Sequence, residues 1–310
     1  MDQQANQKRG LFIGVTTLDC IYQADHPPAE NEKVVALKSL MVAGGPATNA
    51  AVAFAQLSKG NQAVLSSVLG AHPVTELLRE DLHSQGVVIA DLLPERLGPP
   101  PVSSIVVSAN SGDRAVISRS AEDMPVEATQ VSKEILENVD IVLVDGHQMA
   151  VGAQVAKWAK AKDIPIVVDA GSWKLGFESM LALADVVVAS ANFYPPGCAD
   201  SESVFEYLRS LGISKAAITR GSNPILYYEN DEQHELEVPQ VKAVDTLGAG
   251  DIFHGAFCHF FLTHTFEETL MKASRTASFS CQHWGTRDWT KIYRITDDAE
   301  EDESDEENAN

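Results

Sequence analysis

Short apolar runs alternate with helical patterns along most of the chain. The runs are rich in β-branched residues, which is typical of buried strands, and the helical segments repeat apolar residues every three or four positions. This alternation predicts an α/β fold with a mainly parallel central sheet and helices on both faces. The expected strands are 11–15, 63–69, 141–144, 164–169, 186–189 and 216–219, and the expected helices are 47–57, 74–85 and one that opens at the glycines before residue 251.

Three parts of the chain depart from this alternation. Residues 20–42 and 102–119 have the pattern of extended strands, the second interrupted by a turn at 110–113. They predict a second, small β-sheet, which is either a lid over a site or an ordinary edge sheet. Further along, 224–228 and 234–238 flank a polar turn and predict a β-hairpin.

The composition is that of a globular protein with unevenly distributed negative charge. With 310 residues, of which 45% are hydrophobic, the chain can form one large α/β domain or two smaller ones. The formal net charge is -21, and nine of the acidic residues lie within 297–307, where there is no basic residue. The remainder is still acidic, which argues against nucleic acid as a partner, because phosphate backbones need a basic surface. We expect residues 296–310 to form a disordered tail with a solubilising or an interaction role, and residues 1–9 to be flexible.

Membrane, secreted and metal-binding classes are disfavoured by the same reading. No run of eighteen apolar residues occurs and the first ten residues are mostly polar, so we expect neither a membrane span nor a signal peptide and predict a cytoplasmic protein. The four cysteines are dispersed without a Cys-x-x-Cys pair, which favours buried free thiols over a zinc site or a disulfide framework.

The stretch with the clearest chemistry is Asp-Thr-Leu-Gly-Ala-Gly-Asp at 245–251. Its Gly-Ala-Gly run has almost no side chains, so backbone N–H groups at the start of the following helix can face a phosphate, which the helix dipole also favours. Asp251, in the first helical turn, can accept the proton of an attacking hydroxyl as a general base. The alternative is an ordinary helix start capped by Asp245 or Thr246. The residues expected to act in phosphoryl transfer are Asp251, Gly248, Ala249 and Gly250.

A second motif, Ala-Gly-Gly-Pro-Ala-Thr-Asn, lies far upstream at 43–49. Together the two motifs resemble the paired signatures of the PfkB (ribokinase) family of carbohydrate kinases, and the resemblance covers about residues 10–290. It implies a ribokinase-like kinase domain at 10–295, in which the segments 20–42 and 102–119 form a lid over the sugar. Such a lid would exclude water, which otherwise competes for the phosphate.

Within the family, the chain resembles ketohexokinase-like and sulfofructose-kinase-like members, which implies a ketose or a related polyol as acceptor. Pro46 stands where kinases of phosphorylated sugars tend to place a lysine, so an uncharged acceptor is favoured. Alternative roles are a strand-end cap for Asp19 and a surface arginine for Arg114, and we expect His254 to pack rather than to touch the sugar. The residues implied in acceptor binding are Asp19, Asp25, Gly44, Gly45, Asn49 and Arg114.

The nucleotide side departs from the family pattern at two places. Pro224 replaces the last glycine of a Thr-x-Gly-x-x-Gly turn, and Pro195 stands where many members have the glutamate of an Asn-x-x-Glu motif that organises magnesium. The resemblance implies ATP and Mg²⁺ as cofactors, with Mg²⁺ held mainly by phosphates and water and no protein ligand assigned, and it leaves open whether K⁺ is also required. The residues implied in nucleotide binding are Asn192, Thr219, Gly221, Thr246, Gly248, Gly250, Ala277 and Cys281.

These observations predict an ATP-dependent kinase for a small sugar, a ketose such as fructose or a related compound. Two alternatives remain: a nucleoside kinase of the adenosine type with the same fold, and a catalytically weak sugar-binding regulatory protein, which the missing glutamate keeps open. The expected partners are the sugar and ATP, without nucleic acid or membrane, and the resemblance allows a homodimer formed through the lid. The sequence leaves open which sugar and which hydroxyl react.

Overall fold

A computed structural model describes residues 7–119, 124 and 126–293 of the chain. The predicted acidic tail at 296–310 and most of the predicted flexible N-terminus lie outside the described residues. Lys8 and Arg9 are described, and they belong to the fold. The Lys8 Nζ donates a hydrogen bond to the His259 carbonyl oxygen, and the Arg9 N–H donates to Asp140 at 2.7 Å, so the prediction of flexibility was wrong for these two residues.

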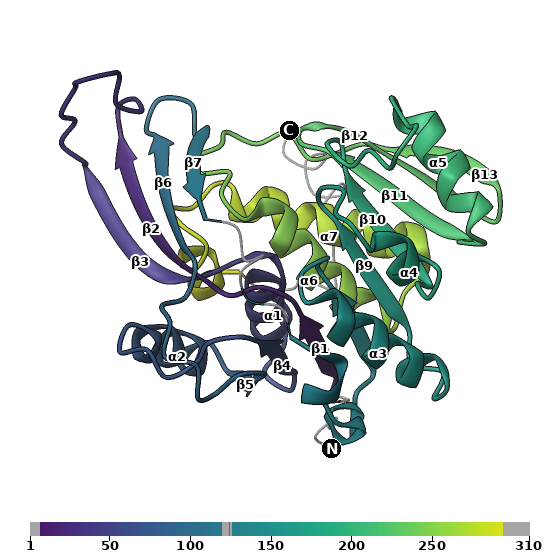
Figure 1. The fold of residues 1–310 in the computed structure, drawn as a ribbon. Helices are drawn as coiled ribbons and strands as arrows, with labels where there is room; N and C mark the ends of the chain where they lie inside the picture. Colours follow the sequence, from purple (N-terminus) through teal and green to yellow (C-terminus); the bar gives the residue numbers. More distant parts are fainter. Residues whose placement is uncertain (1–6, 120–123, 125, 294–310) are drawn as a thin grey trace, which may run out of the picture.

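The main sheet contains nine strands within the described residues, in the order β13-β12-β11-β10-β9-β8-β1-β4-β5 (Figure 1). The seven strands from β11 to β5 pair in parallel, and β12 and β13 add an antiparallel edge. The central strands are almost wholly apolar because both faces of a parallel sheet are covered. The strands are β1 Arg9–Ile13, β4 Gln62–Ser67, β5 Val87–Asp91, β8 Ile141–Val144, β9 Ile166–Ala170, β10 Val186–Ser190, β11 Lys215–Arg220, β12 Asn223–Glu229 and β13 Glu232–Leu236.

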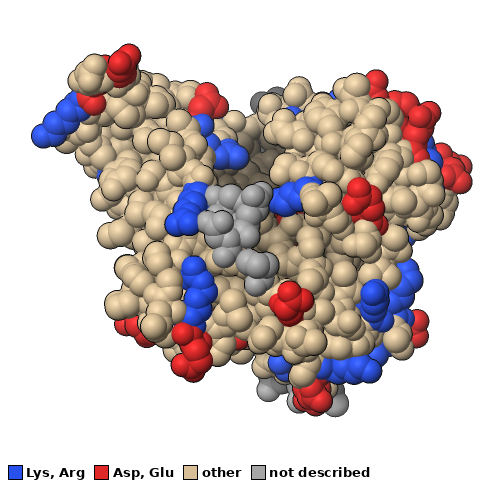
Figure 2. All heavy atoms as spheres, viewed as in Figure 1, with Lys and Arg blue, Asp and Glu red and all other residues tan. Residues whose placement is uncertain are grey.

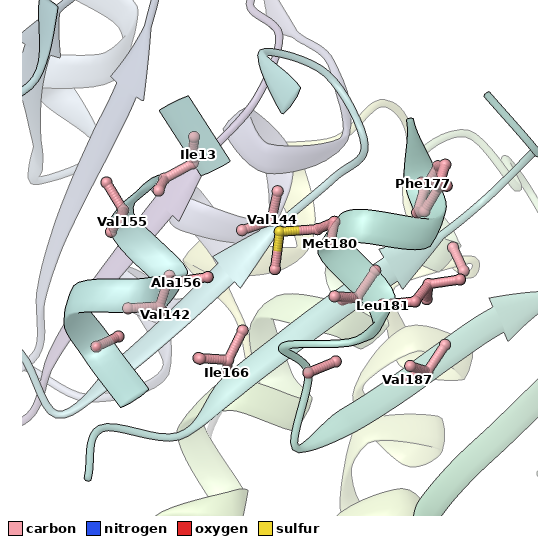
Figure 3. Close-up of a cluster of buried hydrophobic side chains, with 14 of the residues drawn as sticks. Ile13, Val142, Val144, Val155, Ala156, Ile166, Phe177, Met180, Leu181 and Val187 are labelled. Carbon is pink, nitrogen blue, oxygen red and sulfur yellow. The ribbon is translucent and has the colours of Figure 1, made fainter. Parts of the chain in front are cut away.

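Helices cover both faces of this sheet, as the alternating pattern predicts (Figure 1). One face carries α1 Pro46–Leu57, α2 Thr75–Ser84, α6 Ala249–Phe261 and α7 Phe266–Ser280. The opposite face carries α3 Met149–Lys160, α4 Phe177–Leu181 and α5 Ser201–Ser210. Figure 3 shows the core on this second face, where Val155 and Met180 from the helices meet Val142, Val144 and Ile166 from the strands. Short 3₁₀ helices occur at Ala128–Gln130, Lys133–Leu136 and Asp288–Lys291.

A second, four-stranded sheet stands beside the main body, and it is hereafter called the lid after the role predicted for it (upper left in Figure 1). Its strands lie in the order β3-β2-β6-β7, with β2 and β6 parallel and the outer pairs antiparallel. The apolar side chains of its inner face, such as Ile21 and Ile105, pack with Leu247 and Trp284 of the main body. The strands are β2 Thr17–Ala24, β3 Lys38–Gly44, β6 Val102–Ser108 and β7 Arg114–Ser118, which confirms the predicted small sheet.

Two local predictions need correction. Strand β1 ends at Ile13 and β2 begins at Thr17, ahead of the predicted extended segment 20–42, so Asp19 lies inside a lid strand. Pairing with β3 and β6 on either side extends the strand back through Leu18 and Asp19, which outweighs the turn-like residues of this segment. The hairpin turn is also shorter than predicted, because Asn230 and Asp231 alone adopt positive φ angles of 49° and 71° between the two strands.

The order of the strands determines where a site can form. From β1 the chain runs outward to β4 and β5, and it then returns to β8 on the other side of β1. Open α/β sheets bind ligands at such a reversal, in the crevice beyond the carboxyl ends of the strands. Within the described residues, no helix combines the length and the apolar character that crossing a bilayer requires.

Candidate active site

The glycine turn before α6 forms a cradle for an anion. Gly248 has a φ of 71°, which favours glycine, and a Cβ there would lie 2.8 Å from the Thr286 Cγ2. Gly250 is exposed, and a Cβ there would meet nothing within 4 Å. Because the first turn of a helix has N–H groups without intrahelical partners, this end of α6 presents donors and the positive dipole end to one place. The arrangement suits a phosphate group.

Asp251 follows the cradle and is partly buried. Its Oδ2 accepts a hydrogen bond of 2.9 Å from the Asn49 amide Nδ2, which comes from α1. Burial and the negative charge of Asp169 raise the pKa of Asp251 to about 7, while the Asn49 hydrogen bond, His254 and Arg114 act in the opposite direction. A carboxyl group with this pKa can accept a proton near neutral pH, which a general base requires.

The predicted acceptor residues Asp19, Gly44, Gly45 and Asn49 form a continuous group where the lid strand β3 leads into α1. The Oδ1 of Asp19 accepts a 2.6 Å hydrogen bond from the Thr17 hydroxyl, and burial raises the pKa of this carboxyl group. A Cβ at Gly44 would lie 1.9 Å from the Asp19 Oδ2. Gly45 has a φ of 100°, and a Cβ there would lie 2.4 Å from the Val15 carbonyl oxygen. Both glycines are therefore required for the lid strand to approach Asp19 and the end of β1.

Asp145, at the end of β8, belongs to the same crevice and was missed by the sequence reading. Its buried Oδ2 accepts the N–H groups of Val15 and Ala47, both at 3.1 Å, and so ties the end of β1 to the first turn of α1. Burial would raise the pKa of this carboxyl group, but His147, through its charge and its hydrogen bonds, and the Val15 N–H hold the pKa below its usual range. A Cβ at Gly14 would lie 2.0 Å from this carboxylate, so position 14 also requires glycine.

Asp169, at the end of β9, was missed as well. Burial raises its pKa, and the charge of His254 opposes that rise. The Nδ1 of His254 lies 3.6 Å from the Asp169 carboxylate and 2.7 Å from the Gly250 carbonyl oxygen, while Nε2 lies 3.2 Å from the Val188 carbonyl oxygen. His254 is thus a buried, hydrogen-bonded packing residue, as expected, and it connects Asp169 to the glycine turn. Both missed aspartates end an apolar strand that a glycine closely follows, and this is the signal that could have identified them.

A cavity of about 610 Å³ opens on the other side of the glycine turn. This volume is within the range of small-molecule and cofactor sites. Figure 2 shows a hollow between the lid and the part of the main body that contains β11 and β12 in Figure 1, with Lys and Arg side chains at its rim. Of the residues predicted at the nucleotide, Thr219, Gly221, Thr246, Gly250, Ala277 and Cys281 line the cavity, together with Ala249 and Arg114.

Arg114 joins the lid to the rim of this cavity. Its Nη1 donates to the carbonyl oxygen and to the hydroxyl of Thr246, at 3.1 and 3.2 Å. The Thr246 hydroxyl in turn donates to the Gly112 carbonyl oxygen at 3.0 Å, so the turn between β6 and β7 is held against the glycine turn of α6.

Two predicted residues are not brought into these groups. Asp25 is exposed just after the end of β2, six residues beyond Asp19, which corresponds to about 20 Å along a strand. Asn192 is exposed in the turn after β10, where its N–H donates to the Ser190 hydroxyl, and it does not line the cavity. Within a single copy of the chain, neither residue joins the Asp251 site.

The sequence predicts that Mg²⁺ has no assigned protein ligand, and it leaves the need for K⁺ open. No group of three or more His, Cys, Asp or Glu residues that could hold a metal ion occurs among the residues that the structure describes. The buried Asp245 carboxylate accepts the N–H groups of Leu247 and Gly285, both at 2.9 Å, so this aspartate ties the glycine turn to the segment after α7 through hydrogen bonds.

The chain is similar to known proteins over most of its length. A family model described as pfkB family carbohydrate kinase matches residues 8–292. A ribokinase from Lactococcus lactis is 24% identical over 89% of this chain and 91% of its own length, and a ketohexokinase from Mus musculus is 21% identical over 81% and 88%. Among solved structures, a ribokinase from Giardia lamblia superimposes with a TM-score of 0.77 at 17% identity, covering 93% of this chain and 96% of that protein.

Proposed function

Because the chain belongs to the pfkB family of carbohydrate kinases, we propose that it transfers the γ-phosphate of ATP to a hydroxyl group of a small, uncharged sugar. One observation carries this proposal. Asp251, with a pKa of about 7, lies in the first turn of α6, with the cavity on one side and the Asn49 side chain on the other. A base in this position can take the hydroxyl proton of an acceptor on the Asn49 side while the transferred phosphate lies at the glycine turn.

The remaining residues position and stabilise the reactants. The cavity residues hold the nucleotide, and the N–H groups at the start of α6 stabilise the negative charge of the phosphate during transfer. Mg²⁺ bound with the nucleotide would supply positive charge that neutralises the phosphates. On the acceptor side, Asp19 and Asn49 offer groups that can bond to sugar hydroxyls. The need for K⁺ and the roles of Asp25 and Asn192 stay predictions.

A substrate screen with coupled detection of ADP tests the proposal. We expect ADP release with fructose or a related ketose, and ribose is the second acceptor to test, since ribokinases are among the relatives. Adenosine and inosine test for a nucleoside kinase, and phosphorylated sugars test whether the acceptor must be uncharged. Turnover with nucleosides alone would favour a nucleoside kinase. Sugar binding, seen by calorimetry, without any turnover would favour a regulatory protein.

Arg114→Ala should lower kcat/KM by at least about ten-fold, because the lid arginine at the cavity rim stabilises the reacting phosphate. Thermal stability should change little, since its hydrogen bonds to Thr246 are exposed. Lys38→Ala is the matched control, because Lys38 is an exposed cation of the lid strand β3. Equal kinetics of Arg114→Ala and the parent would remove Arg114 from the site.

The pH dependence of kcat/KM should report Asp251. Activity requires the carboxylate, so it should fall as the pH drops through about 7. This fall forms the acidic limb of the pH profile. The charge of Asp169 raises the pKa of Asp251, so Asp169→Asn should move the acidic limb to lower pH, by about one pH unit. Asp185→Asn is the control, because Asp185 precedes β10 at the opposite end of the sheet and accepts the Ile166 N–H there. A limb that stays in place in Asp169→Asn would contradict the assignment of the base.

The cytoplasmic location and the homodimer also belong to this proposal. The outer face of the lid exposes Met41 on β3, Tyr22 on β2 and Ile117 on β7, and these apolar side chains offer a surface that a second lid can cover. Light scattering after gel filtration measures the mass directly, and a monomer at assay concentration would exclude the dimer.

A further inference from the structure

We infer that Arg287 is a positioning residue for the phosphoryl transfer, acting through the amide of Asn49 on the base Asp251. This inference rests on the proposed function. It arises from a chain of contacts in which Arg287 bonds to Asn49 and Asn49 bonds to Asp251.

Arg287 lies inside the protein, with only 7% of its surface exposed. Its Nη1 donates to the Asn49 Oδ1 at 3.0 Å, and its Nη2 donates to the Ala43 carbonyl oxygen at 2.6 Å and to the Asp81 Oδ2 at 3.2 Å. The fork shape of the guanidinium group allows it to reach these partners at once, which a lysine ammonium does not.

The two contacts of Asn49 determine the direction of its amide. A guanidinium group has only donors, and an ionised carboxylate has only acceptors. The Asn49 oxygen must therefore face Arg287, and its NH₂ group must face Asp251. The reversed amide would place NH₂ against the guanidinium group and the oxygen against the carboxylate, which loses both hydrogen bonds. Arg287 thus keeps a donor directed at the base.

The same guanidinium group also binds the end of the lid strand β3 at Ala43, hereafter called the lid root. Ala43 is the residue before Gly44 in β3, and its N–H donates to the Asp81 Oδ2 at 3.0 Å while its carbonyl oxygen accepts from Arg287. Arg287 and Asp81 therefore fix the strand at the point where it enters the glycine pair. The lid root and the base share one side chain as their support.

Stability alone does not account for an arginine here. Within the described residues, the buried Nε of Arg287 has no hydrogen-bond partner. A buried charged group with an unpaired donor is costly, and well-packed apolar residues often replace buried ion pairs without loss of stability. The geometry points to a role in orienting Asn49.

Arg287→Met tests this role, since it keeps an unbranched apolar stem and removes the guanidinium donors. We expect kcat to fall by about a hundred-fold, because small displacements of reacting groups have effects of this order. The KM for ATP should change little. A free Asn49 amide no longer favours the Asp251 carboxylate, so the pKa of Asp251 should rise and the acidic limb of kcat should move to higher pH. The kcat of Arg287→Lys should lie between those of the parent and Arg287→Met. Arg287→Lys replaces Arg287→Met as the test if Arg287→Met fails to fold.

Arg79→Met is the matched control. Arg79 also forms an ion pair with a mostly buried carboxylate, Asp91 at 2.6 Å, and it lies on the same helix as Asp81. Its loss should lower the melting temperature without moving the acidic limb. A merely structural Arg287 would behave like Arg79.

A double-mutant cycle isolates the path through Asn49. If Arg287 acts through this amide, Arg287→Met should cost little further activity in an Asn49→Ala background. Fully additive losses with an unmoved limb would overturn the inference. The ¹³C carboxyl signal of Asp251, identified by its absence in Asp251→Asn, titrates independently of turnover. If the parent phosphorylates no acceptor, the proposed function fails, and this titration still decides whether Arg287 orients Asn49 toward Asp251.

Discussion

Asp251→Asn should reduce turnover by roughly a hundred- to ten-thousand-fold, the range found for the loss of a general base. The asparagine keeps the shape of the side chain and an oxygen that can accept the Asn49 hydrogen bond, but it does not take up a proton at neutral pH. The KM values for sugar and ATP should change far less than kcat, because the contacts of the ground state persist. Steady-state kinetics with the acceptor identified by the screen measure both quantities.

The same substitution should increase stability. An aspartate whose folded-state pKa is raised from 3.8 to about 7 is more easily ionised in the unfolded chain, so its ionisation destabilises the folded protein above pH 4 and most fully above pH 7. Asp251→Asn removes this cost, and at pH 8 the gain should be on the order of 1 kcal/mol or more. The gain should disappear as the pH falls toward 4. A variant that is both inactive and less stable at pH 8 would indicate damage to the fold rather than the loss of a base.

Gly255→Ala should have the largest effect on folding. A Cβ at this position would lie 2.2 Å from the Ala50 carbonyl oxygen and 2.7 Å from the Ala53 Cβ, where α6 crosses α1. The helices must separate, and overpacking of this kind costs about 1–3 kcal/mol or more. For a domain of this size, a loss of about 3 kcal/mol corresponds to a fall in melting temperature of roughly 6–12 °C. The kcat of the folded variant should fall as well, because α1 carries Asn49 and α6 carries Asp251, and separating the helices moves these two residues apart.

Gly250→Ala is the control for this effect on folding. Gly250 lies in the same helix, but a Cβ there meets nothing within 4 Å, and its backbone does not need a positive φ. Alanine also favours helices over glycine by up to about 1 kcal/mol, so the urea midpoint should stay the same or rise. If Gly255→Ala and Gly250→Ala unfold at the same urea concentration, α1 and α6 tolerate separation and the close contact has no special role.

The two sequence motifs correctly predicted those parts of the site that are formed by residues close together in the chain. The run at 245–251 indicates a glycine turn followed by a helix, and the structure has this turn and helix, with Asp251 in the first helical turn. The run at 43–49 likewise leads into α1 and places Asn49 on it. These arrangements depend on backbone freedom and helix ends, which neighbouring residues determine.

The residues that sequence reasoning missed act over long distances in the chain. Asp145 bonds to the Ala47 N–H, 98 residues away, and Arg287 bonds to Ala43, 244 residues away. No periodicity or spacing reveals such pairs, because they depend on strand order and helix packing. The expectation for Asp25 shows the converse problem, since its distance from Asp19 follows only once β2 is known to run without interruption between them.

The position of Arg287 after all the strands of both sheets bears on when the protein becomes active during synthesis. Ribosomes release the chain from its N-terminus at about 5–20 residues per second, and domains tend to fold as they emerge. All strands of both sheets precede residue 240. Arg287, the partner that orients Asn49, lies 238 residues after Asn49 in the chain. A nascent chain can therefore complete its sheets and still lack the support of its base. Catalytic competence should therefore arise late, once α7 and the segment that carries Arg287 have left the exit tunnel.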